Sequence, residues 1–226
     1  RTRVFRGMPR TAPFGSYDER MLPASNRLTV RVVPVRYLDT NLVIQSNELA
    51  QLYNGPQYSC VSNYYAVQSG GKLAVNAIVA DMINLPLSRA AYNTTADWYN
   101  TNFLWTAFTN LTNQFAAWGA TQAASTFDAN GDGFLDAVLF VHAGEGGETT
   151  GSTNDIHSHM WSAYLHANSG DPHTLGNAVA GLRIGNLYFG RYYIIAEILN
   201  GRATNIFQRS TIGGAVHEFG HILGLT

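Results

Sequence analysis

Residues 137–143 read Ala-Val-Leu-Phe-Val-His-Ala, an apolar run with the length of one β-strand. A strand that is apolar on both faces is typical of the middle of a sheet covered by helices on both sides. The glycine-rich stretch 144–147 follows directly and is expected to end the strand. The run therefore predicts a central strand over 137–143.

Segments on either side of this run carry further strand patterns. Apolar and polar residues alternate over 28–37 and 73–77, which predicts a strand at each place. Pro34 lies inside the first of these and indicates a sheet edge or a bulge. Shorter strands are expected over 187–189 and 192–196.

Helical patterns alternate with these strands. Apolar spacing predicts short helices over 46–55, with Ser46 as N-cap and Gly55 as stop, and over 59–70. The longest helix is expected over 96–118, with the amphipathic stripe of a helix that backs a sheet. Its stripe consists of Leu104, Ala107, Phe108, Leu111, Phe115 and Trp118. Alternating strands and helices place the chain in the α/β class.

Composition excludes several classes of protein. The 226 residues are 46% hydrophobic and carry a net charge of −1, with no basic cluster of the kind that binds nucleic acid or an anionic membrane. No apolar run approaches the roughly 18 residues of a membrane span. Cys60 is the only cysteine, which excludes a disulfide framework and a cysteine zinc site. We expect Cys60 to be a small core residue.

The first 26 residues differ from the rest of the chain. They hold Arg1, Arg3, Arg6 and Arg10 together with several prolines, and they show no periodicity. We interpret residues 1–26 as an extended arm or the remnant of a pro-segment. The folded domain is then expected over 27–226.

The last predicted helix, from about Ser210 to Gly224, carries the signature His217-Glu218-Phe219-Gly220-His221. At about 100° per residue the two histidines share one face, so both imidazoles can reach one metal ion. Zinc prefers neutral imidazole nitrogen. Glu218 is too close to the first histidine to join it as a ligand, but it is placed to accept a proton from metal-activated water. The opposite, core-facing side is expected to consist of Ile212, Val216, Phe219 and Leu223.

Gly224, three residues after His221, narrows the type of site. In the longer signature H-E-x-x-H-x-x-G-x-x-H/D the glycine turns the chain sharply toward a third metal ligand. Here that ligand is expected at the position after Thr226. The sequence thus predicts a zinc centre of a peptidase in which His217 and His221 are ligands and Glu218 is the general base.

Residues 128–136 have the first half of a calcium loop, with oxygen ligands at positions 1, 3, 5, 7 and 9 and glycine at position 6. The expected ligands are Asp128, Asn130, Asp132, the carbonyl of Phe134, and Asp136. Leu139 stands at position 12, where a full EF-hand has Glu, so a further ligand would come from elsewhere, for example Glu145 or Glu148. The alternative is a solvated Asx-rich turn before a strand.

Together these motifs resemble the immune inhibitor A family of secreted zinc metallopeptidases, which belong to the metzincin-like group. The family's His-Glu-Phe-Gly-His-x-Leu-Gly-Leu matches 217–225, and its aspartate-rich stretch before an apolar strand matches 128–144. Its Ser-His-x-Trp element is similar to 158–161, and its Tyr-Tyr…Ser-Gly-Gly-Lys-Leu element is similar to 64–73. These matches occur in the family's order and cover roughly 28–225. Thr226 departs from the Pro that the family has before its third ligand, an Asp.

The resemblance implies an upper metzincin-type catalytic subdomain, with a twisted mixed sheet, a backing helix and an active-site helix. A lower subdomain would follow it. Implied with this are secretion, extracellular proteolysis, protein or peptide substrates, zinc as cofactor and calcium as a structural ion. No nucleic acid partner and no membrane insertion are expected. The rival interpretation is a non-catalytic, calcium-stabilised binding module that retains a relict zinc helix.

Weaker signals remain. His157 and His159 would share one side of a strand, but such a pair is more often engaged in hydrogen bonds than in metal binding. His142, His166 and His173 are interpreted in the same way. Glu197 lies in the apolar stretch Ile-Ala-Glu-Ile and requires a partner if buried. For it we expect a salt bridge or a capping role rather than catalysis.

Overall fold

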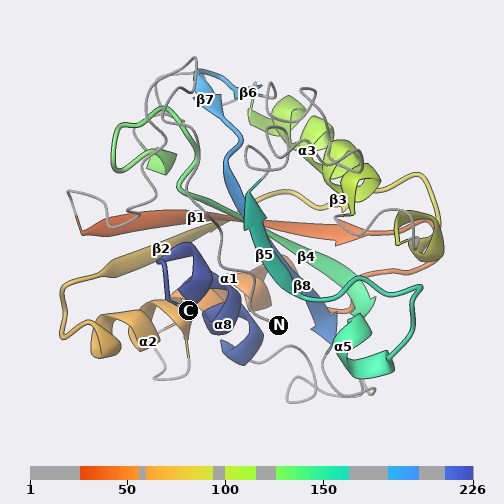
Figure 1. Ribbon diagram of the computed structural model, residues 1–226, viewed down its shortest axis with the longest axis horizontal. Coiled ribbons are helices and arrows are strands. Elements are labelled where there is room, and N and C mark those ends of the chain that lie inside the picture. Colours follow the sequence, from red (N-terminus) through yellow and green to blue (C-terminus); the bar gives the residue numbers. More distant parts are fainter. Residues whose placement is uncertain are drawn as a thin grey trace, which may run out of the picture.

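A mostly parallel central sheet organises the chain (Figure 1). The computed structural model describes residues 26–55, 60–93, 100–115, 126–162, 183–198 and 212–225. The sheet contains β1 (Arg27–Arg36), β2 (Ala74–Val79), β3 (Ile83–Asn84), β4 (Ala137–Glu145), β5 (His159–Ser162) and β8 (Arg191–Ile198). Their order is β2-β1-β4-β8-β5, and β3 pairs with β1 beyond the end of β2. All pairs are parallel except β5, which runs antiparallel to β8 at the edge.

The predicted central strand is confirmed. β4 lies between β1 and β8 and is parallel to both. Its residues from 137 to 144 are all buried. Val138 and Phe140 belong to the apolar cluster on one face of the sheet, while Leu139 and Val141 belong to the cluster on the other. β4 is apolar at successive positions because each of its two faces packs against an apolar cluster.

Pro34 lies inside the sheet, which corrects the expectation of an edge or a bulge. β1 pairs with β4 on one side and with β2 and then β3 on the other. The carbonyls of Val32 and Arg36 accept hydrogen bonds from the β2–β3 side, so the nitrogen of Pro34 faces that side too. There β2 pairs as far as Val32 and β3 begins to pair at Val35. Proline is tolerated because its missing N–H falls in the gap between two partner strands.

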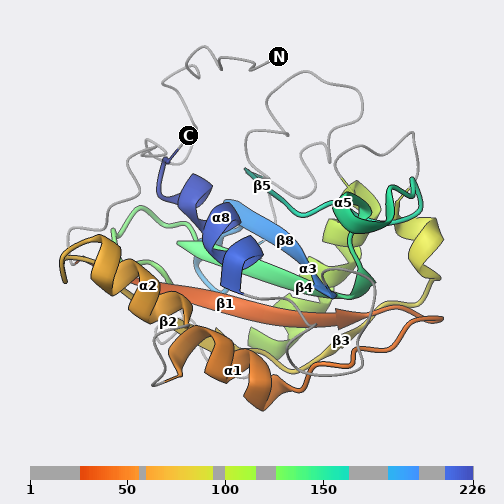
Figure 2. The same ribbon diagram turned by 90° about the horizontal axis from the view of Figure 1, so that it is seen from below.

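Helices cover both faces of the sheet (Figures 1 and 2). One face carries α3, and the other carries α1, α2 and α8. The helices are α1 (Ser46–Asn54), α2 (Val61–Gln68), α3 (Thr101–Phe115), the short α5 (Gly147–Thr150), α8 (Ile212–Ile222), and a 3₁₀ turn η1 (Arg89–Tyr92). None of the described helices is long and apolar enough to cross a membrane. The arrangement is mixed α/β, as the sequence predicted.

The bounds of α1 and α2 differ from the predictions by one or two residues. The predicted start of the longest helix at residue 96 is wrong, because Asn100 has φ +52° and is not helical, and α3 begins at Thr101. The described part of the longest helix is α3, and the stripe residues from Leu104 to Phe115 are buried in it. Gln45, not Ser46, precedes the first helical turn of α1, and its N–H donates to Glu48 Oε2 at 2.7 Å. Cys60 is buried and its Sγ accepts from the N–H of Asn63 at the start of α2. The core assignment of Cys60 is therefore confirmed.

The predicted strand at 187–189 belongs to a small separate hairpin. β6 (Arg183–Ile184) and β7 (Leu187–Tyr188) form a two-stranded antiparallel sheet. Tyr188 exchanges backbone hydrogen bonds with Gly133 and Leu135, so the hairpin is attached to the loop before β4. The arm over 1–25, residues 96–99 and 116–118 of the longest predicted helix, the first two residues of the terminal helix, His166 and His173 lie outside the described residues.

Candidate metal centre

α8 packs its apolar side against the sheet and α2. Ala215, Phe219 and Ile222 are fully buried, and the Phe219 ring lies 5.1 Å from that of Tyr65 and 5.9 Å from that of Tyr193. Four residues were predicted to face the core. Phe219 lies at the centre of the buried face of α8, whereas Ile212, Val216 and Leu223 lie at the margins of that face and are only partly buried. The buried stripe is thus rotated relative to the prediction. His217 is left exposed and His221 partly exposed.

Two polar contacts brace this helix from the core. Tyr65 of α2 donates its hydroxyl hydrogen to the Val216 carbonyl at 2.6 Å. Arg191 of β8 donates from Nη1 to the carbonyl of Ile222 at 2.7 Å, which satisfies one of the unpaired carbonyls at the end of the helix. Neither role was predicted from the sequence. The contact of Tyr65 could have been suspected, because a tyrosine on the apolar side of a helix needs a hydrogen-bond partner for its hydroxyl group.

Gly224 turns the chain sharply after α8, as the signature predicted. It has φ +83°, the left-handed conformation that glycine adopts without steric cost. Its N–H donates to the His221 carbonyl at 3.0 Å and the next N–H, of Leu225, donates to the Gly220 carbonyl at 3.0 Å. This pair of bonds is a Schellman motif. It reverses the chain, so the carbonyl of Leu225 returns to the side of His221.

The two histidines meet through their Nε2 atoms. His217 Nε2 and His221 Nε2 are 3.2 Å apart, and the ring planes are nearly perpendicular, at 86°. His221 Nδ1 lies 2.9 Å from the carbonyl oxygen of Leu225. A carbonyl only accepts, so Nδ1 carries the proton and the Nε2 of neutral His221 presents its lone pair. Such a contact to the second nitrogen is how metal-binding histidines are usually oriented.

This geometry fits a shared tetrahedral ion. Two imidazole nitrogens at the usual Zn–N distance are about 3.3 Å apart in a tetrahedral site. The observed 3.2 Å agrees with that separation. Within the described residues, no third His, Cys, Asp or Glu joins the pair. The position that would carry the third ligand of the longer signature comes after Thr226.

Glu218 is buried beside the pair, with 7% of its surface exposed. Burial raises the pKa of its carboxyl group, while His217, His221 and a hydrogen bond from the Met160 backbone of β5 act to lower it. The carboxyl group therefore sits between the histidine pair and the edge strand of the sheet. A carboxylate with a raised pKa in such a position can accept a proton from water near neutral pH.

The loop predicted to bind calcium is tightly turned. Gly131 and Gly133 have φ of +72° and +84°. Asp128 accepts hydrogen bonds from the N–H groups of Asp132 and Gly133, both at 3.0 Å. Asn130 Oδ1 also accepts from the N–H of Asp132, at 3.2 Å. The side chains of this loop thus turn inward to its own backbone.

The charges of this loop repel one another. Burial raises the pKa of Asp132, and it raises that of Asp136 to about 7 with further contributions from Asp128 and Asp132. Asp136 accepts from the N–H of Ala129 through both carboxylate oxygens, and the Phe134 side chain is buried against Tyr188. A divalent cation would relieve this repulsion, although among the described side chains no three metal-ligand groups converge here.

The rings of two other described histidines, His142 and His159, are engaged in hydrogen bonds. His142 is fully buried in β4, with Nδ1 3.2 Å from the Ala143 carbonyl. His159 Nδ1 lies 2.7 Å from the carbonyl of His157. This contact agrees with the interpretation that the 157–159 pair serves hydrogen bonding.

Glu197 is a buried carboxylate that accepts three backbone hydrogen bonds. Its Oε2 accepts from the N–H groups of Val43 at 2.7 Å and Ile44 at 2.9 Å, and its Oε1 accepts from Gly144 at 3.0 Å. The residue joins β8 to the end of β4 and to the loop after β1. The expectation of a capping role is confirmed, since the partners include backbone N–H groups.

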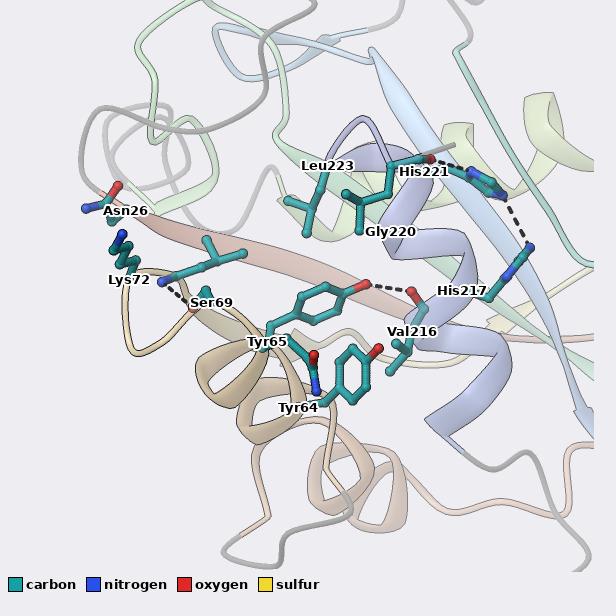
Figure 3. A pocket seen from close by; sticks show the side chains of 13 residues that line it. Asn26, Tyr64, Tyr65, Ser69, Lys72, Val216, His217, Gly220, His221 and Leu223 are labelled. Carbon is teal, nitrogen blue, oxygen red and sulfur yellow. Dashed lines mark hydrogen bonds between the residues drawn. The ribbon is translucent and has the colours of Figure 1, made fainter.

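A groove of about 770 Å³ opens beside the histidine pair, between α2 and α8 (Figure 3). His217 and His221 line one end, and Lys72 and Asn26 line the other, with Tyr65 between them. The sequence did not predict this groove, because its two helices are about 150 residues apart in the chain.

No protein-family model matches the chain, and no curated protein matches it.

Proposed function

We propose that this chain forms the upper part of the catalytic domain of a secreted zinc endopeptidase. One observation carries the proposal: the Nε2 atoms of His217 and His221 converge to 3.2 Å, and the Leu225 carbonyl leaves a lone pair on the second of them. Two unprotonated imidazoles at that separation would repel each other unless they share a proton or a metal ion. The HEXXH spacing on a helix favours the metal.

In this proposal each group at the site has a separate task. His217 and His221 hold zinc, which when bound supplies Lewis-acid polarisation of water and of the scissile carbonyl. Glu218 accepts the proton of the attacking water and then delivers it to the leaving nitrogen. Glu218 is a buried residue of α8 itself, and its place next to His217 in the sequence keeps it close to the pair without making it a ligand.

The edge of the sheet provides a place for the substrate. β5 is antiparallel to β8, and its outer side is an unpaired strand edge in the described part of the chain. An extended peptide can add to such an edge as a further strand. We propose that a peptide bound along β5 passes Glu218, whose carboxyl group contacts the Met160 backbone of that strand. The proposed arrangement is of the metzincin type, with α3 as the helix that backs the sheet and α8 as the active-site helix.

Metal content tests the proposal directly. Purified protein is loaded with zinc, desalted and measured by elemental analysis. The expected result is one zinc per chain, which falls to below about a tenth in His217→Ala and His221→Ala. The matched control is His157→Ala, since His157 is exposed and away from the pair; it should keep its zinc. Zinc retained in both ligand variants would refute the proposed centre.

Activity separates the peptidase from the rival binding module. Glu218→Gln keeps the size of the side chain and removes its basicity, so it should bind zinc and lose cleavage of a protein substrate by a factor of about 10² to 10⁴. A chelator should abolish wild-type cleavage. A zinc-loaded protein, extended through its third ligand, that cleaves no protein or peptide would favour the non-catalytic module.

We also infer that Asp128, Asn130, Asp132, Phe134 and Asp136 bind calcium. The support is the inward-turned loop and the repulsion between the buried carboxylate of Asp136 and the half-buried ones of Asp128 and Asp132. Without a bidentate Glu at position 12 the affinity is expected in the range of extracellular modules, about 10⁻⁴ to 10⁻³ M. The ion would hold the loop and the attached hairpin β6–β7, not take part in catalysis.

A further inference from the structure

The groove between α2 and α8 is partly apolar and carries a cationic side chain, Lys72, at one end. Leu73, Val216 and Leu223 contribute apolar surface. Among the residues that the structure describes, none that lines the groove is Asp or Glu. Besides Tyr64 and Tyr65, its described titratable lining groups are Lys72, His217 and His221, to which a bound metal would add two positive charges.

Lys72 is the only lysine in the sequence. It follows the turn after α2 at Gly70 and Gly71, and its side chain is exposed at the end of the groove opposite the histidines (Figure 3). Among the described residues no carboxylate lies within ion-pair distance of its ammonium group. An exposed cation at the end of a groove without acidic groups attracts an anionic ligand group.

We propose that this groove binds the part of a peptide substrate next to the scissile bond, and that Lys72 makes it prefer an acidic side chain there. The inference rests on the proposed peptidase function, because the groove is continuous with the two metal ligands. A volume of about 770 Å³ lies within the usual range for binding pockets. The occupant is therefore a peptide segment that carries Asp or Glu.

Binding is measured without catalysis. Glu218→Gln protein, zinc-loaded and also metal-free, is titrated into fluorescein-labelled heptapeptides that differ only in Glu or Gln at one position, tested at each position in turn. At one position the Glu peptide should bind about two- to fivefold more tightly, the size expected for a partly exposed ion pair. The preference should decline with added salt.

A matched pair of variants assigns the preference to Lys72. In the same background Lys72→Gln should abolish the difference between the Glu and Gln peptides, and Lys72→Arg should keep it. Arg183→Gln removes the same charge at a surface site over the Tyr188 ring, away from the groove, and should leave the difference intact. Equal binding of the two peptides at every position, or a preference that survives Lys72→Gln, would overturn the proposal.

The single lysine allows a direct footprint. An N-hydroxysuccinimide ester acylates Lys72 and the chain's α-amine, and mass spectrometry measures each separately. The Glu peptide should slow acylation of Lys72 at least twofold without changing that of the α-amine. Lys72 that resists acylation before any peptide is added would show that the chain itself fills the groove, which also overturns the proposal.

The two proposals fail in different ways. If acidic peptides bind through Lys72 but no form of the protein cleaves a peptide, the groove stands as a binding site and the peptidase function fails. If cleavage occurs with the same kcat/KM for Glu and Gln peptides at every position, the peptidase function stands and the role of Lys72 fails.

Discussion

Glu197→Gln is expected to destabilise the fold strongly although it replaces an atom of similar size. The carboxylate accepts from Val43 and Ile44 through Oε2 and from Gly144 through Oε1. A glutamine has one oxygen, and we expect it to face the two amides of the loop. Its NH₂ group then points at the N–H of Gly144, and two donors face each other in a site that is fully buried.

The magnitude follows from these contacts. An unsatisfied buried N–H costs about 1–3 kcal/mol, and a hydrogen bond to a charged acceptor is worth about 1 kcal/mol more than one to a neutral acceptor. One lost and two weakened bonds sum to about 4 kcal/mol, of which relief of the buried charge returns some. We expect a net loss of about 3 kcal/mol in the free energy of unfolding, or about 1.5 M in the urea midpoint for an m-value of about 2 kcal/mol/M.

Urea unfolding followed by tryptophan fluorescence measures this loss at pH 7. The matched control is Glu145→Gln at the end of β4, because in the described part of the chain the Glu145 side chain makes no hydrogen bond or ion pair. It should change the midpoint by less than about 0.3 M, as is usual for a change that removes no contact. A Glu197→Gln midpoint within 0.3 M of wild type would refute the reasoning that these three amides depend on the carboxylate.

Three further outcomes are expected. Burial lowers the pKa of His142 to about 4, so as the pH falls the histidine is protonated in the unfolded chain before it is protonated in the folded one. The free energy of unfolding should therefore fall by about 3 kcal/mol between pH 6.5 and pH 4, which urea unfolding across that range measures. At 10 mM calcium, a dissociation constant of about 1 mM gives about 1.4 kcal/mol of stabilisation, seen as a rise in Tm that Asp132→Ala removes. Gly224→Ala strains a residue at φ +83° by about 1–2 kcal/mol and displaces the Leu225 carbonyl, so zinc affinity in a chelator competition should fall about 10- to 100-fold.

Each of these outcomes has a control. His142→Phe removes the titrating group, so any slope that persists between pH 6.5 and pH 4 comes from other residues and contradicts the assignment. Magnesium at the same concentration should raise Tm less than calcium does; an equal rise would indicate general screening. Gly185→Ala strains a left-handed glycine at φ +59° in the β6–β7 turn, and an equal loss of zinc affinity in that variant would contradict the role of the Leu225 carbonyl.

The sequence predicted the elements that are long and regular. The central strand is apolar at every position up to His142, and the α3 stripe repeats over four turns, so neither pattern has a competing interpretation. Gly224 was predicted because only a left-handed residue completes the turn after the histidines. In these cases a local physical requirement decides the structure.

Other features depend on contacts between distant residues. β5 and the β6–β7 strands have four or two residues each, too few to show a period of two. Pro34 was assigned to an edge because the sequence does not show that two partner strands meet beside it. The groove at the candidate site likewise needs α2 and α8 side by side. Lys72 belongs to the Ser-Gly-Gly-Lys-Leu element, but nothing in that element indicates that its side chain lines a groove beside the histidines.

Among the described residues, the central sheet separates two apolar clusters that have no fully buried side chain in common, and only the partly buried Leu42 packs against both. Along β1, Val30 and Val32 face the side of the histidine helix, whereas Val33 and Val35 face the side of α3. Substitutions on one side are therefore free to accumulate during evolution without repacking the other. An insertion or deletion of one residue within β1 or β4 would instead exchange the two sides for the whole rest of the strand. Natural length variation in such proteins should be confined to the loops.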